Sequence, residues 1–203
     1  SLRWLLGVAV VAAAGTVTAG PYVSAAAFIA RAADLPGAPA TLAAWTASPV
    51  TAPTNAIVPT RYGEVPGRVY RPAKGFSRTI VLVPGVHRDG IDEARLVGLA
   101  QDLAATGYGV LTVAAPDLQR YRITPLVTDV IEDAVYWASG QRELAPDGRV
   151  GVLGVSFSGG LSIVAAGRDS IRDRGAFLLS FGGHGHLARV MHYLCSGEVV
   201  GDM

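Results

Sequence analysis

The sequence predicts an α/β fold: a mostly parallel sheet with helices on both faces, preceded by an apolar helix. Two observations predict it. Short apolar runs rich in β-branched residues alternate with helical segments over most of the chain. The runs are apolar throughout, which is typical of strands buried on both faces. Ligands of such sheets bind at the carboxyl ends of the strands, so the loops that follow the strands are the places to look for a site.

Each element has its own signal. Strands are expected at 79–83, 108–113, 150–153 and 175–181, and a hairpin at 57–61 and 68–71 around 63–67. Helices are expected at 92–106, 124–139, 159–166 and 187–194. Gly107 ends the first of these helices, and Thr124-Pro125 begins the second. The last strand has no later strand to pair with, so we expect it to be an exposed apolar edge.

The composition of the chain excludes several classes of function. The 203 residues predict one domain, or one domain with an appendage, and half of them are hydrophobic, which allows a sizeable core. The formal net charge of +1 argues against a nucleic-acid partner. Cys195 is the single cysteine, which excludes an intrachain disulfide and a structural zinc site built from cysteines alone. No cofactor and no metal is indicated.

The amino-terminal segment is the least polar part of the chain. From Trp4 to Ala30 there is no charged residue, and Arg3 and Arg31 flank the run. Since about 20 apolar residues cross a bilayer, we expect a membrane anchor and a membrane-bound protein. Two alternatives stay open: a signal peptide, which would be cleaved to give a secreted protein, and a buried helical hairpin. The predicted organisation is therefore an anchor or signal segment at 1–34, a Pro- and Ala-rich linker at 35–55, and a domain at 56–203.

The strongest chemical signal lies between the strand 150–153 and the helix after it. Gly154 to Gly160 reads GVSFSGG and leads into a helix of small apolar residues. A serine attacks only when it stands clear of the sheet and a base removes its proton, and a sharp strand-to-helix turn with small neighbours exposes it. We predict Ser156 as the nucleophile, because Gly154 precedes it by two positions. Ser158 is the alternative nucleophile, and a phosphate-binding turn is the alternative function.

These residues resemble the α/β-hydrolase superfamily, in particular its esterase and dienelactone-hydrolase-like or prolyl-peptidase-like branches. The resemblance covers 57–194 and is most specific at 149–160 and 81–90. Ser158 departs from the family pattern, which has a second glycine there. The resemblance implies a serine hydrolase that cleaves a small-molecule ester, lactone or peptide-like bond through an acyl-serine intermediate.

The resemblance also implies an oxyanion hole. By position, its backbone N–H donors would be Val86, in the loop after the strand 79–83, and Phe157, directly after the nucleophile. His87 lies beside this loop and is expected to shape it rather than to react. Asp117 is expected to form a turn.

The rest of the catalytic triad is not evident. In the family an acid and a histidine follow the nucleophile, but the loop 182–186 holds no carboxylate and offers His184 and His186. We expect the chain to be an amino-terminal fragment that is inactive as it stands, with His184 as the candidate base if it is not. An inactive scaffold that binds a ligand or partner and an acyltransferase are the rival functions.

Overall fold

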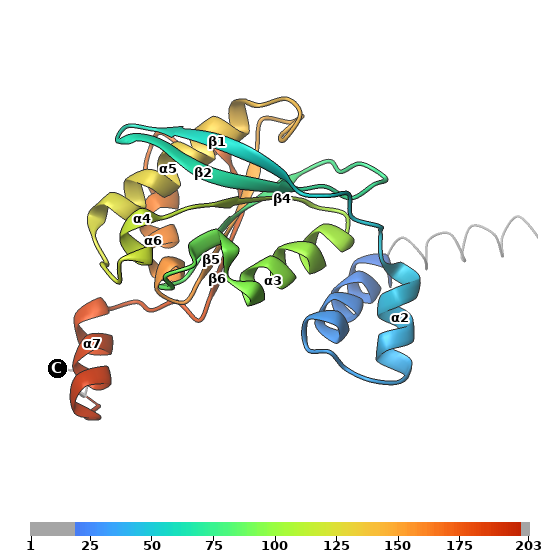
Figure 1. Cartoon of the computed structure of the whole chain (residues 1–203), viewed down its shortest axis with the longest axis horizontal. Coiled ribbons are helices and arrows are strands. Elements are labelled where there is room, and N and C mark those ends of the chain that lie inside the picture. The colour runs from blue at the N-terminus through green and yellow to red at the C-terminus, as the bar shows by residue number, and fades with distance from the viewer. Residues whose placement is uncertain (1–18, 200–203) are drawn as a thin grey trace, which may run out of the picture.

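The computed structural model describes residues 19–199, and it contains the predicted α/β architecture (Figure 1). Six strands form one sheet in the order β1-β2-β4-β3-β5-β6. The strands from β3 to β6 pair in parallel, whereas β1 and β2 form an antiparallel hairpin at one edge. All four parallel strands therefore end at the same edge of the sheet, where the loops after β3 and β5 meet.

The strands lie close to their predicted positions. They span Thr54–Thr60 (β1), Gly63–Tyr70 (β2), Thr79–Val83 (β3), Gly109–Val113 (β4), Val150–Val155 (β5) and Gly175–Phe181 (β6). The hairpin differs from the prediction, because residues 63–67, expected as its loop, belong to β2. The turn is formed by Arg61 and Tyr62 instead, and β1 and β2 pair from Thr60 and Gly63 outward.

The helices also follow the predicted pattern. They span Ala38–Thr46 (α2), Ala94–Ala105 (α3), Pro116–Gln119 (α4), Pro125–Gly140 (α5), Phe157–Ala166 (α6) and Leu187–Ser196 (α7). The α4 turn was not predicted, and α6 begins two residues earlier than expected, directly after Ser156. Short 3₁₀ turns at Gly90–Asp92 and Arg172–Arg174 complete the described elements.

The core has two layers, because alternate side chains of each strand point to opposite faces of the sheet. Ile80 and Leu82 of β3 pack with α3 on one face. Val81 and Val83 pack on the other face with the cluster that includes α5 and Ala165 of α6. Every residue of β3 and β4 is buried, as expected for central strands of a parallel sheet.

The predicted membrane location is wrong. Within residues 19–199 no helix is long and apolar enough to cross a bilayer. The first part of the predicted anchor, residues 4–18, lies outside the described residues. Its second part belongs to a helix that covers residues 19–32 and lies beside α2 (Figure 1), packing on protein. Ala27 and Ala30 are buried, and Phe28 packs against the core cluster around α3. Arg31 fastens this helix, because its guanidinium donates to the backbone carbonyl of Ala43 at 2.6 Å.

The sheet edge at β6 is open, as the sequence predicts. β6 pairs only with β5, and Phe177, Leu178, Leu179 and Phe181 are exposed. The helix that follows, α7, projects away from the body of the molecule (Figure 1), and none of its residues is buried. Helix α6 packs against β6, but the side chains of Phe177, Leu178, Leu179 and Phe181 remain exposed.

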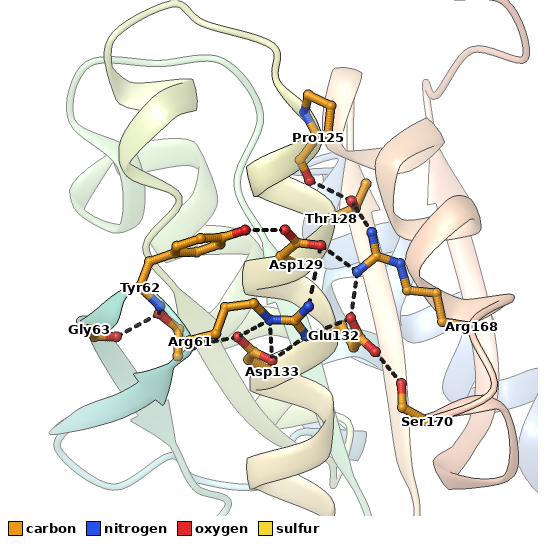
Figure 2. A network of polar contacts seen from close by, with 11 residues as sticks. Arg61, Tyr62, Gly63, Pro125, Thr128, Asp129, Glu132, Asp133, Arg168 and Ser170 are labelled. Carbon is orange, nitrogen blue, oxygen red and sulfur yellow. Dashed lines mark hydrogen bonds and ion pairs between the residues drawn. The ribbon is translucent and has the colours of Figure 1, made fainter.

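A charged network joins three segments that lie far apart in the sequence (Figure 2). Arg61, in the hairpin turn, donates to Glu132 at 2.7 Å and to Asp133 at 2.6 Å, both on α5. Arg168, just after α6, donates to Asp129 and Glu132 of the same helix. The network thus holds the hairpin and the end of α6 against α5.

The hydrogen bonds of this network change the acidity of its carboxylates. Burial alone would raise the pKa of Glu132, but hydrogen bonds from Ser170, Arg168 and Arg61 outweigh burial and hold that pKa below its ordinary value. The pKa of Asp129 is also lowered, chiefly by the hydrogen bond from the Tyr62 hydroxyl. A carboxylate whose pKa is lower in the folded state than in the unfolded chain stabilises the fold above the unfolded pKa. That stabilisation is lost as the pH falls through the folded value.

We predict that Glu132→Gln lowers the free energy of unfolding by about 1–3 kcal/mol near neutral pH, since it removes a charged acceptor from two guanidinium groups. As the pH falls below about 4, the ordinary carboxylate pKa, and on through the lowered pKa of the folded state, the difference should shrink. Urea unfolding from pH 3 to 7 measures both effects. The exposed Glu143→Gln is the matched control and should change stability by less than about 0.5 kcal/mol. Equal losses at the two positions would contradict the prediction.

Candidate active site

Ser156 occupies a strained turn between β5 and α6. Its backbone dihedrals are φ 57° and ψ −129°, a conformation that a residue with a side chain adopts only at a cost of about 1–3 kcal/mol. A hydrogen bond to a neighbouring strand holds this turn: the Ser156 N–H donates to the carbonyl of Phe181, at the end of β6, at 2.8 Å. Ser156 itself is exposed. Its side chain therefore stands clear of the sheet, at the amino end of a ten-residue helix.

Two glycines allow α6 to approach the sheet and the next loop closely. A Cβ atom added to Gly154 would lie 2.5 Å from the carbonyl oxygen of Ser158. A Cβ atom added to Gly160 would lie 2.6 Å from the ring of His184. Gly154 and Gly160 are thus required by packing, which explains why glycine occupies these two positions.

Ser158, the alternative nucleophile, is fully buried and has a structural role. Its hydroxyl proton lies within reach of two carbonyl oxygens, that of Val83 at the end of β3, at 2.9 Å, and that of Val155 at the end of β5, at 2.8 Å. The same hydroxyl accepts a hydrogen bond from the N–H of Val155 at 2.8 Å. The side chain that replaces the family's second glycine therefore ties the carboxyl ends of β3 and β5 together, directly beneath Ser156.

A cavity of about 400 Å³ opens beside Ser156. It lies between the loop after β3, the amino end of α3 and the end of β6. It is lined by Pro84, Gly85, Val86, His87, Gly90, Glu93, Arg95, Leu96, Leu99, Val155, Ser156 and Phe181. Gly85 packs so closely that a Cβ atom there would lie 3.3 Å from the Cβ of Ser156. The loop after β3 and the turn at Ser156 therefore form one surface, although 70 residues separate them in the sequence.

The two predicted oxyanion donors lie on this surface. Val86 lines the cavity, and Phe157 is the first residue of α6. Neither backbone N–H donates a hydrogen bond to a group within residues 19–199. The N–H of Phe157 has no acceptor inside its own helix, because the first turn of a helix leaves its donors free. Both N–H groups are therefore without an acceptor in this part of the chain, and of the two residues only Val86 lines the cavity.

The histidines are placed differently from one another. His184 packs edge-on against the Phe157 ring at a centroid distance of 5.1 Å, and neither of its buried ring nitrogens has a partner within residues 19–199. It is not hydrogen-bonded to Ser156. His186 caps α7 by accepting from the N–H of Arg189 at 3.1 Å. His87 lines the cavity.

Two further predicted loop residues have local partners. His87 Nδ1 accepts a hydrogen bond from the backbone N–H of Asp89 at 3.3 Å, within the loop after β3. Asp117 accepts a hydrogen bond from the Thr124 hydroxyl at 2.6 Å and so closes the loop between α4 and α5. Both contacts fit the loop-shaping roles expected from the sequence.

Sequence reasoning missed the part of the cavity that α3 contributes. Leu96 and Leu99 have the spacing of residues on one apolar face of that helix, which predicts a place in the core, and both also line the cavity. The available signal was positional: α3 begins a few residues after the loop that carries Val86, so its first turns lie at the edge where ligands bind.

Comparison with solved structures identifies proteins of similar fold. A dienelactone hydrolase from Anabaena variabilis is 20% identical over 68% of this chain and 67% of its own, with a TM-score of 0.55. Brefeldin A esterase, a bacterial homologue of human hormone sensitive lipase, is 22% identical over 76% of this chain and 45% of its own, with a TM-score of 0.51. An esterase from Pyrobaculum calidifontis is 24% identical over 66% of this chain and 44% of its own, with a TM-score of 0.49.

The likenesses to the dienelactone hydrolase and to brefeldin A esterase show that the chain has the α/β-hydrolase fold. The chain spans less than half of the length of the two esterases. No family model matches the sequence, and no curated protein sequence matches it significantly.

We predict that Gly154→Ala destabilises the protein by about 1–3 kcal/mol, because the new methyl group overlaps the α6 backbone. Gly98→Ala, in an open position within α3, is the control and should instead stabilise the protein by about 0.5–1 kcal/mol. Thermal and urea unfolding of the two variants give the comparison. Similar effects at both glycines would show that α6 is less closely packed on β5 than described.

Proposed function

We propose that this chain is a serine hydrolase that cleaves an ester, lactone or peptide-like bond of a small molecule through an acyl-serine intermediate, with Ser156 as the nucleophile. One observation carries the proposal. Ser156 combines backbone strain, exposure and a cavity beside it, whereas the neighbouring Ser158 is buried and fully engaged. Strain persists in a fold where the surrounding structure enforces it, and it gathers at sites of function.

The geometry supports a two-step acyl transfer. The Ser156 Oγ bonds to the substrate's carbonyl carbon while its proton passes to a base. The carbonyl oxygen becomes negative and accepts hydrogen bonds from the N–H groups of Val86 and Phe157. The bond to the leaving group then breaks, and the leaving group takes up the proton. Water repeats the sequence on the acyl-serine, which releases the acid and restores the Ser156 hydroxyl.

His184 is the proposed base, and its present position requires it to move. Its ring nitrogens are buried against Phe157, where each unpaired polar group costs about 1–3 kcal/mol. Gly182, with a backbone φ of 66°, and Gly185 flank this part of the loop and permit the turn. A rotation towards Ser156 would relieve the unpaired state of the ring and supply the missing acceptor.

The observation that favours a rival function is the free Ser156 hydroxyl. Within the described residues no side chain accepts its proton, and this is what an inactive scaffold that binds a ligand would also show. The fold's resemblance to esterases supports the hydrolase, and a covalent probe separates the two.

We predict that a fluorophosphonate probe labels the protein and that Ser156→Ala abolishes labelling. Ser158→Ala should keep at least part of the labelling, although loss of its buried hydroxyl should lower stability by about 1–3 kcal/mol. Mass spectrometry of the labelled peptide, together with circular dichroism to confirm folding, measures this. Labelling that survives Ser156→Ala and disappears in a folded Ser158→Ala protein would reverse the assignment.

We predict that His184→Ala lowers the rate of labelling by about 10²-fold or more, the usual contribution of a positioned base. His186→Ala is the matched control, because His186 lies in the same loop and caps α7. It should leave the labelling rate within about twofold of wild type. If His184→Ala labels as fast as wild type, another residue is the base.

A further inference from the structure

The cavity beside Ser156 has one wall made by a helix that the proposed mechanism does not use. Leu96 and Leu99, one turn apart on α3, line it together with Phe181 and Val86. Leu96 is 5% exposed and belongs to the core, and Leu99 is half-buried against it. Their positions are therefore fixed by the packing of α3 on β3 and β4, so this wall is rigid and apolar.

The charged residues of the lining neutralise one another. Arg95 donates to the Glu93 carboxylate at 2.7 Å. The second oxygen of that carboxylate accepts from the Leu96 N–H at 2.9 Å and caps α3. Glu93 is thus committed to two partners, and Arg95, whose side chain is 86% exposed, pairs with it through Nε. The pair carries no net charge, so this part of the lining offers a charged ligand no excess of opposite charge to offset its lost hydration.

We propose that α3 forms the acyl-binding wall of the site, and that Leu96 and Leu99 limit the length of an uncharged, unbranched acyl group. This inference rests on the proposed function. The volume of about 400 Å³ lies near the lower end of the range for small-molecule pockets, about 300–1,000 Å³, which fits an acyl group of short to medium length. Each methylene group that enters such a cavity strengthens binding about fourfold, until the chain meets the wall.

The alternative is that these two leucines serve only the core. Leu103 provides the matched control, because it lies on the same helix, is 8% exposed and does not line the cavity. A purely structural role predicts that Leu96→Ala and Leu103→Ala change stability alike and leave the preferred chain length unchanged.

The first experiment measures binding without chemistry. Straight-chain alcohols from ethanol to decanol are titrated into the full chain and its variants, with the leucine methyl signals followed by NMR. In the wild type, affinity should rise with chain length and then level off. Leu96→Ala and Leu99→Ala should move that limit to longer alcohols, Leu99→Trp should move it to shorter ones, and Leu103→Ala should not move it. Because Leu99 is half-buried, its substitutions should cost less stability, so the Leu99 variants can still test the proposal if Leu96→Ala does not fold.

The second experiment measures the reaction. In p-nitrophenyl alkylphosphonates, the Ser156 Oγ forms a bond to phosphorus, p-nitrophenolate leaves and the serine proton passes to the base. The chain-length limit for the rate of this reaction should match the limit for alcohol binding and shift with it in the same variants.

Two results would overturn the wall assignment. One is a length limit that is the same in the Leu96 and Leu99 variants as in Leu103→Ala. The other is that 6-hydroxyhexanoate, a six-carbon alcohol with a carboxylate at its far end, binds as tightly as hexanol. Alcohol binding that behaves as predicted, with no phosphonate of any length reacting, would leave the wall in place and refute the proposed hydrolysis instead.

Discussion

The structure around the site depends on the hydroxyl of Ser158. One buried oxygen atom contacts the ends of two parallel strands: it accepts from the Val155 N–H, and its proton lies within reach of the Val83 and Val155 carbonyls. The paired backbones set the register of β3 and β5, and this side chain adds a contact where their pairing ends. The loop after β3 and the turn at Ser156 consequently meet as one surface. The exposed serine and the loop that carries Val86 both lie beside this contact and line the same cavity.

The helices on the two faces of the sheet have different structural roles. On one face, α3 supplies a rigid apolar wall and carries the helix over residues 19–32, which Arg31 fastens to α2. On the other face, α5 is the centre of a charged network that holds α6 from its far end through Arg168. Helix α6 is therefore held at both ends. At its amino end it packs closely on Gly154 of β5, and at its carboxyl end Arg168 forms ion pairs with α5. A site at its amino end gains precision from both.

The sequence predicts the fold well, because apolar strands and amphipathic helices each have their own periodicity. The serine turn was predictable for the same reason: Gly154 and Ser156 lie at a fixed spacing between a strand and a helix. The role of Ser158 was not predictable, since its hydrogen bond to Val83 joins residues 75 positions apart. The membrane anchor was a wrong prediction, because an uncharged helix that packs on protein through Ala27 and Ala30 has the same composition as one that enters lipid.

The backbone of Ser156 has an evolutionary consequence. A glycine would adopt its dihedral angles with less strain, so a lineage under selection for folding alone would be expected to lose the serine and gain stability. Random mutation repeatedly produces this replacement of serine by glycine. A strained serine that stands in solvent beside a cavity is what selection for a chemical task would leave behind, because folding alone gives no reason to keep it.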